Sequence, residues 1–130
     1  MPQASAIDFT ARVVPGRKRG RTIGTPTINL HLKDVPAELA QGIYACFTWL
    51  DDERKEAVMH YGPRPVYDDT ISCEVHVPGE AIPDAPDALR IHVVAFIRDV
   101  TDFPLREVLQ EQIKSDIKVA HAILSSPQQP

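Results

Sequence analysis

The sequence has little of what marks a disulfide-linked or membrane-spanning protein. Its 130 residues include two cysteines, Cys46 and Cys73, which lie far apart and form no Cys-x-x-Cys pair. Neither a disulfide framework nor a zinc site is therefore expected. No apolar run approaches the roughly 20 residues that a membrane span needs, and residues 1–10 lack the regions of a signal peptide. We expect a cytoplasmic protein with two buried thiols and no membrane partner.

A surplus of positive charge is also missing. Lysine and arginine number 14 against 18 aspartates and glutamates, which gives a formal net charge of −4. Nucleic-acid-binding domains usually carry a basic surface, so this balance argues against a nucleic-acid partner. The length and the 43% of hydrophobic residues are those of one domain with a single core. We expect residues 1–130 to form one domain that is monomeric.

What the chain does contain is a series of short segments with alternating polarity. Twelve prolines and six glycines divide it, and most pieces between them alternate apolar and polar residues as half-buried strands do. The expected strands cover residues 7–13, 28–32, 42–50, 57–59, 71–77 and 89–98. Asp51 and Asp52 are expected to turn a hairpin between the third and fourth strands. Six strands in a small domain most economically close into a barrel, because closure removes exposed edges.

The hydrophobic period changes near residue 104. Apolar residues then recur at spacings of three and four, as on one face of a helix packed against a core. These residues are Leu105, Val108, Leu109, Ile113, Ile117, Ala120 and Leu124. Pro104 suits the first turn of a helix, where its missing N–H costs nothing. The pattern predicts an all-β fold with one C-terminal helix packed outside the barrel.

Residues 16–30 form a glycine-rich and cationic segment, Gly-Arg-Lys-Arg-Gly-Arg-Thr-Ile-Gly-Thr-Pro-Thr-Ile-Asn-Leu. Backbone amides freed by glycine can point at one anion, so the segment suits a phosphate. It is neither a Walker A loop nor a Gly-x-Gly-x-x-Gly dinucleotide motif. Glycine-rich turns often serve geometry only and basic clusters are often solvated, so the segment alone leaves both interpretations open.

Strand alternation places Thr27, Asn29 and His31 on one face and Ile28, Leu30 and Leu32 on the inward face. Hydroxyl and amide oxygens are ligands that Mg²⁺ accepts while it keeps waters and substrate phosphates. Thr27 and Asn29 can instead make turn or cross-strand hydrogen bonds. The sequence by itself leaves both interpretations open.

Other polar and aromatic residues have two interpretations as well. Glu74 and His76 share a strand face, where Glu74 is either a general base or an exposed carboxylate. His76 can orient a neighbour by a hydrogen bond or remain solvated. Asp116, near the apolar stripe of the helix, is expected to bond to a loop backbone. Core packing is expected for the aromatic residues Tyr44, Trp49 and Phe96.

Several short motifs together resemble the riboflavin kinase family. The first runs from Gly16 to Asn29 in the pattern Gly-x-x-x-Gly-Arg-x-Ile-Gly-x-Pro-Thr-x-Asn. The others, in the family's order, are Gly42-Ile43-Tyr44, Tyr61-Gly62-x-Arg64-Pro65, Glu74-Val75-His76, Phe96-Ile97-Arg98-Asp99 with Phe103, and the helix residues Leu109, Gln112, Ile113, Asp116 and Ala120. Each motif alone is unspecific. Their combination, between about residues 8 and 124, carries the resemblance.

The resemblance implies a closed six-stranded antiparallel barrel of riboflavin kinase type. It implies an ATP-dependent phosphotransferase that converts riboflavin to FMN by transfer of the γ-phosphoryl group to the 5′-hydroxyl. Glu74 matches the general base, and Thr27 and Asn29 match the Mg²⁺-associated positions. The positions matching the nucleotide site are Gly16, Gly20, Arg21, Gly24, Pro26 and Thr27, and the candidate substrate contacts are Arg64, His76 and Arg98. A non-catalytic flavin- or nucleotide-binding module on the same barrel is the alternative.

The sequence departs from the family mainly on the flavin side. After His76 it reads Val-Pro-Gly-Glu, where the family has an apolar pair and then Asp-Phe, and Arg64-Pro65 is followed by Val-Tyr in place of Thr-Phe. Thr25 stands where an aromatic residue is common. Nucleotide motifs are thus better preserved than flavin motifs, which leaves the acceptor open. Bacterial members often carry an adenylyltransferase domain ahead of the kinase; a stand-alone kinase and an excised domain both fit these 130 residues.

Overall fold

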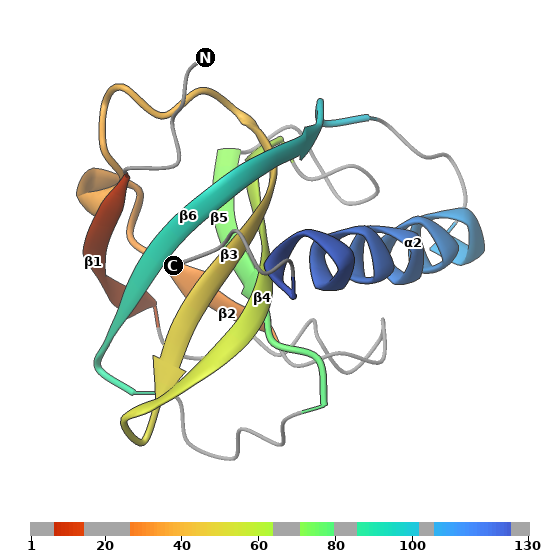
Figure 1. Ribbon diagram of the computed structural model, residues 1–130. Helices are drawn as coiled ribbons and strands as arrows, with labels where there is room; N and C mark the ends of the chain where they lie inside the picture. The colour runs from red at the N-terminus through yellow and green to blue at the C-terminus, as the bar shows by residue number, and fades with distance from the viewer. Residues whose placement is uncertain (1–6, 15–26, 64–70, 80–85, 102–105, 126–130) are drawn as a thin grey trace.

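The computed structural model describes residues 7–14, 27–63, 71–79, 86–101 and 106–125 (Figure 1). Its elements are β1 (Asp8–Val14), β2 (Thr27–Leu30), the 3₁₀ turn η2 (Leu32–Asp34), β3 (Gly42–Leu50), β4 (Glu53–Pro63), β5 (Ile71–His76), β6 (Ala88–Arg98) and α2 (Arg106–Leu124). Within the described part of the chain, no helix combines the length and the hydrophobicity of a membrane-crossing segment.

The strands close into a barrel in the order β1-β2-β5-β4-β3-β6, with every neighbouring pair antiparallel. This confirms the expected barrel. The β3–β4 hairpin turns at Asp51 and Asp52, whose φ values are 51° and 66°. Two positive φ values in a two-residue loop match the right-handed twist of the flanking strands, and aspartate tolerates this conformation better than most residues.

The barrel interior is filled by the inward-facing apolar side chains. Its largest fully buried members are Met59, Leu89, Ile91, Val75, Val77 and Val93. Cys46 and Cys73 lie in the same core as free, buried thiols. Burial raises the pKa of Cys46 well above its usual value and the pKa of Cys73 to about 12.

Helix α2 forms a second layer on the outside of the barrel, over β3, β4 and β6 (Figure 1). Ala120 and Leu124 of the helix pack with the outward side chains of Ile43, Val58 and Val94 in a second apolar cluster. The predicted C-terminal helix is therefore confirmed. Leu105 of its expected apolar stripe lies outside the described residues, and Val108 is 43% exposed.

Three local expectations are wrong. Strand β2 ends at Leu30, because Leu32 begins the turn η2 and is 42% exposed rather than inward. Phe96 is 51% exposed rather than packed in the core, and its ring lies edge-on to Tyr44 with 5.6 Å between the ring centroids. The register of β3 and β6 shifts at this point, where Arg98 pairs with Ile43 and Phe96 with Tyr44. Strand β4 is longer than expected and begins directly after the turn.

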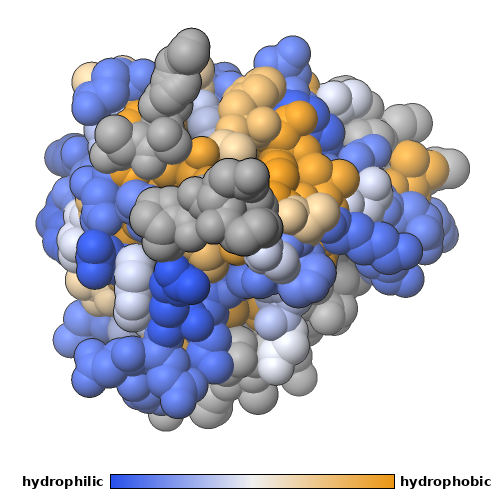
Figure 2. All heavy atoms as spheres, viewed as in Figure 1, coloured by the Kyte–Doolittle hydropathy of each residue, from blue (hydrophilic) through white to orange (hydrophobic). Residues whose placement is uncertain are grey.

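The molecular face seen in Figure 2 is mostly hydrophilic. Apolar side chains gather on it around one end of β6, close to α2. Among the described residues, the large apolar side chains that are more exposed than usual are Leu32, Phe96, Val108 and Val119. Leu32 lies in η2, Phe96 in β6, and Val108 and Val119 both in α2.

We expect Gly62→Ala to destabilise the barrel. Gly62 has a φ of +149°, which L side chains rarely adopt, and an added Cβ would lie 2.8 Å from Val100 Cγ2. Backbone strain together with this crowding should lower the free energy of unfolding by about 2–3 kcal/mol in a urea titration. Gly79→Ala is the matched control: its φ is +80° and nothing lies within 4 Å of an added Cβ. Equal losses in the two variants would contradict the role assigned to crowding.

The two core thiols should resist modification in the folded protein. Their raised pKa values keep them protonated at pH 8, and the thiolate is the reactive form. A colorimetric disulfide reagent should therefore react slowly with the native chain and release two equivalents of product after denaturation. Rapid modification of either cysteine without unfolding would show that the core opens.

Candidate functional site

Four of the residues predicted from the sequence meet on the outer face of β2 and β5. These neighbouring strands pair Thr27 with His76 and Asn29 with Glu74. Side chains directly opposite each other in an antiparallel pair project from the same face of the sheet. The intervening Ile28 and Val75 point into the core, so the four polar residues point outward. The structure therefore gathers them in one two-by-two arrangement.

His76 and Thr27 form the first pair of this arrangement. Nδ1 of His76 lies 3.1 Å from Oγ1 of Thr27, and His76 is 4% exposed. The pKa of His76 is lowered to about 4, mainly because burial disfavours the charged imidazole; the nearby His60 lowers it further and Asp116 opposes the shift. The imidazole is therefore neutral at neutral pH and has little surface to offer a ligand.

Asn29 and Glu74 form the second pair. Asn29 is 6% exposed, and its Oδ1 accepts no hydrogen bond from any residue that the structure describes. Leaving a buried acceptor unsatisfied costs about 1–3 kcal/mol, so a cation or a hydrogen-bond donor at this oxygen would be favourable. Glu74 is half-buried, and Ser72 Oγ lies 3.5 Å from its Oε2, a long contact. An amide oxygen and a carboxylate thus lie side by side at the surface of the barrel.

The second pair continues as a row around the outside of the barrel. Glu74 lies opposite His60 of β4, His60 opposite Ile43 of β3, and Ile43 opposite Arg98 of β6. His60 is therefore a direct neighbour of Glu74, which the sequence analysis missed. The sequence does show that His60 lies two residues from Val58 and so on the same, outer face of its strand. That this face lies beside Glu74 follows only from the pairing of β4 with β5.

Arg98 lies three strands away from Glu74 along this row and is held by α2. Its Nε and Nη2 donate to Oδ1 and Oδ2 of Asp116 at 2.9 and 2.8 Å. Asp116 is 3% exposed and also accepts a hydrogen bond from Gln112 Nε2 at 3.0 Å. The partners of Asp116 among the described residues are thus side chains, a bidentate guanidinium and an amide, and the expected bond to a loop backbone stays a prediction. This ion pair joins the helix to the barrel.

Several predicted site residues lie outside the described residues. They are Gly16, Gly20, Arg21, Gly24, Pro26 and Arg64. The nucleotide flap therefore stays a prediction. Within the described ranges, no group of three or more His, Cys, Asp or Glu side chains is placed to hold a metal ion. A metal at Thr27 and Asn29 would take most of its ligands from phosphates and water.

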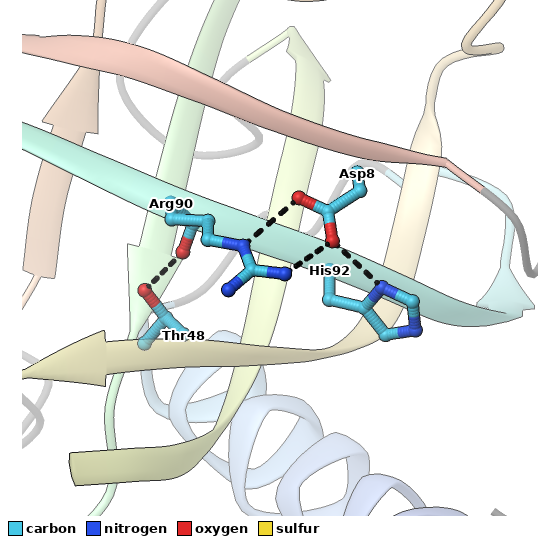
Figure 3. Close-up of polar contacts among 4 residues, drawn as sticks. All are labelled: Asp8, Thr48, Arg90 and His92. Carbon is cyan, nitrogen blue, oxygen red and sulfur yellow. Dashed lines mark hydrogen bonds and ion pairs between the residues drawn. The ribbon is translucent and has the colours of Figure 1, made fainter. Parts of the chain in front are cut away.

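A separate polar cluster joins β1 to β6 (Figure 3). Arg90 donates from Nε and Nη2 to the two carboxylate oxygens of Asp8 at 3.1 and 2.9 Å, and His92 Nδ1 lies 3.2 Å from the same carboxylate. The Arg90 guanidinium also lies 4.1 Å from the centre of the Trp49 ring. These hydrogen bonds to Arg90 and His92 lower the pKa of Asp8. The cluster links three strands, and none of its residues belongs to the predicted site.

The sequence matches the model of a known family. Residues 4–124 match the family described as riboflavin kinase, or flavokinase. The chain is 27% identical over 119 residues to the trifunctional protein RibF/MnmA of Mycoplasmoides gallisepticum. The match covers 91% of this chain and 18% of that protein. The chain is also 31% identical over 117 residues to the bifunctional riboflavin kinase/FMN adenylyltransferase of Haemophilus influenzae, covering 88% of this chain and 38% of that one. The chain thus spans well under half of these curated relatives.

Solved structures share the fold. A structure titled macrolide-efflux protein, from Streptococcus pneumoniae, superposes with a TM-score of 0.75 at 27% identity, covering 89% of this chain and 38% of that one. The riboflavin kinase of Trypanosoma brucei superposes with a TM-score of 0.61 at 23% identity, and the match covers 93% of this chain and 81% of that one. At this low identity, the second likeness supports the barrel architecture alone.

We expect the stability of the protein to fall as the pH is lowered from about 6.5 to 4. The unfolded His76 has an ordinary pKa near 6.5, whereas its folded pKa is about 4, so only the unfolded state gains a proton in this window. The contribution of His76 to the free energy of unfolding is therefore complete above its unfolded-state pKa near 6.5. Below that pH it declines by at most about 1.4 kcal/mol per pH unit. Urea titrations of the unmodified chain and His76→Asn should show a shallower pH dependence in the variant. Identical slopes would mean that His76 titrates normally in the folded state.

Proposed function

The chain belongs to the riboflavin kinase family, and from this premise we propose that it transfers the γ-phosphoryl group of ATP to the 5′-hydroxyl of riboflavin to yield FMN. The observation that carries the proposal is the register of β2 and β5, which brings Thr27, Asn29 and Glu74 to one outer face. Phosphoryl transfer needs mainly alignment of the hydroxyl, neutralisation of charge and acceptance of a proton. The three side chains supply groups suited to these tasks.

We propose Glu74 as the general base. Its carboxylate is half-buried on the middle of three adjacent strands, between Asn29 and His60. A carboxylate in this place can accept the proton of the riboflavin hydroxyl while the phosphoryl group moves to the oxygen. The carboxylate of Asp116 accepts hydrogen bonds from Arg98 and Gln112, which assigns it to the attachment of the helix.

We propose Thr27 and Asn29 as the residues that hold Mg²⁺ with the nucleotide. The buried Oδ1 of Asn29, which accepts no hydrogen bond from a described residue, fits a hard cation that prefers oxygen ligands. Oγ1 of Thr27 lies two residues away on the same strand face. A bound ion would neutralise charge on the phosphates. The glycine-rich segment that precedes Thr27 is proposed to cover the nucleotide, with Arg64 and Arg98 as further candidates for the substrate side.

The setting of the reaction is also proposed. Two free, buried thiols suit a reducing compartment such as the cytoplasm. The net charge of −4 argues against a nucleic-acid partner. We propose a monomer that acts on ATP and riboflavin with neither nucleic acid nor a membrane involved.

Glu74→Gln should lower kcat for FMN formation by about 100-fold or more, since a positioned general base commonly contributes that factor. The KM for Mg·ATP should change little, because the amide keeps the size of the side chain. The measurement is a chromatographic assay of FMN from riboflavin, ATP and Mg²⁺. Glu53→Gln is a matched control, as Glu53 is an exposed carboxylate on β4 that pairs with Lys55 at 3.1 Å.

Two results would redirect the proposal. Normal turnover by Glu74→Gln would remove the role of base from Glu74. Tight binding of riboflavin by the unmodified chain, without FMN formation under any divalent metal, would instead support a non-catalytic flavin-binding module.

A further inference from the structure

We propose that His76 is a positioning residue, whose Nδ1 accepts a hydrogen bond from the Thr27 hydroxyl and so turns the lone pairs of that oxygen toward the metal–nucleotide site. The inference rests on the proposed function, because it assigns Thr27 to the metal site. It changes the expected part of His76 from substrate contact to support of another side chain.

The geometry of the pair leaves His76 little freedom. Thr27 is the first residue of β2 and His76 the last of β5, and the two lie directly opposite each other in the antiparallel ladder. The 3.1 Å between Oγ1 and Nδ1 is a hydrogen-bond distance. His76 is only 4% exposed, so its ring is held by its surroundings and cannot swing out to meet a substrate.

The direction of this hydrogen bond decides whether Thr27 can serve a cation. A hydroxyl carries one proton and two lone pairs. If Nδ1 accepts the hydrogen bond, the hydroxyl proton is directed at the ring and the lone pairs of the oxygen point away from it. If Nδ1 donates instead, one lone pair is consumed and the hydroxyl proton is left to point elsewhere, including toward the ion. Thr27 therefore presents its oxygen to a cation best when His76 carries its proton on Nε2 and accepts at Nδ1.

Burial favours the neutral imidazole, in which one ring nitrogen can accept a hydrogen bond. An imidazolium has a proton on both ring nitrogens and would donate to Thr27, but charging a buried ring is unfavourable. His76 is 4% exposed and lies at hydrogen-bond distance from Thr27, so the neutral ring, with one nitrogen able to accept, suits this place.

The two presumed ligands of the metal differ in their need for support. Oδ1 of Asn29 is a carbonyl-type oxygen with two lone pairs and no proton to place. Thr27 has a hydroxyl that rotates, and rotation would spoil its use as a ligand. The register matches this difference: the histidine that can orient a hydroxyl pairs with Thr27, and Glu74 pairs with Asn29.

The first experiment determines the tautomer of His76 without any variant. A long-range ¹H–¹⁵N correlation spectrum of the ¹⁵N-labelled full chain at pH 7.5 should show Nδ1 of His76 as the unprotonated, pyridine-type nitrogen and Nε2 as the protonated one. A protonated Nδ1 would overturn the proposal, because the ring would then donate to Thr27.

The second experiment is a double-mutant cycle that measures binding of Mn²⁺ with ADP by electron paramagnetic resonance. His76→Leu should weaken binding by about five- to tenfold, the loss expected for one hydrogen bond. Thr27→Val removes the hydroxyl at nearly constant shape and should cost a similar factor. The double variant should bind no more weakly than Thr27→Val, since His76 acts through Thr27. Independent losses that multiply would overturn the proposal.

Two further variants serve as rescue and control. His76→Asn places an amide oxygen near the position of Nδ1 and should recover most of the affinity that His76→Leu loses. His92→Leu replaces a histidine on β6 that contacts Asp8, and it should leave binding of Mn²⁺ with ADP unchanged. A loss in His76→Leu that is confined to the KM for riboflavin would identify His76 as a flavin contact and reject the positioning role.

FMN formation by the unmodified chain is measured separately, so the two ideas can fail independently. If FMN forms and the losses multiply, the positioning role is rejected and the kinase function stands. If the losses are coupled but no FMN forms, the positioning role stands and the kinase function is rejected.

Discussion

The site depends on the register between β2 and β5. Because side chains alternate along a strand, the pairing of Thr27 with His76 and of Asn29 with Glu74 places all four on the outer face. A slip of one residue would turn one strand's pair inward, into an apolar core, and bring Ile28 or Val75 outward. The cost of burying those polar groups specifies the register, so the packing of the barrel and the composition of the site are set by the same constraint.

The outside of the barrel is divided between two uses. Over β3, β4 and β6, α2 covers an apolar cluster that includes Phe47 and Val58. On β2 and β5 the outward positions are polar instead. The ion pair of Arg98 with Asp116 lies where the row from Asn29 and Glu74 meets the helix. A nearly buried ion pair adds little to stability in general, but breaking it by removing one partner is costly. The Arg98–Asp116 pair therefore favours one position of the helix on the barrel.

Much of the fold followed from local patterns, and parts of the site did not. Period-two alternation predicted the strands and placed Thr27 and Asn29 on one face, and three-and-four spacing predicted α2. Leu32 was misplaced because the strand ends at Leu30 and a 3₁₀ turn follows, which the alternation of polarity does not show. His60 was missed because its position beside Glu74 arises only when β4 pairs with β5.

The sequence by itself determined which way most strand residues face, since alternation is a property of the local backbone and needs no partner. It also determined the order of the motifs, and so the family. Only the tertiary structure decided which outward side chains meet. Thr27 and His76 are 49 residues apart, and their contact exists because the barrel closes with β2 beside β5. Closure depends on burial summed over all six strands, and no short segment encodes that sum.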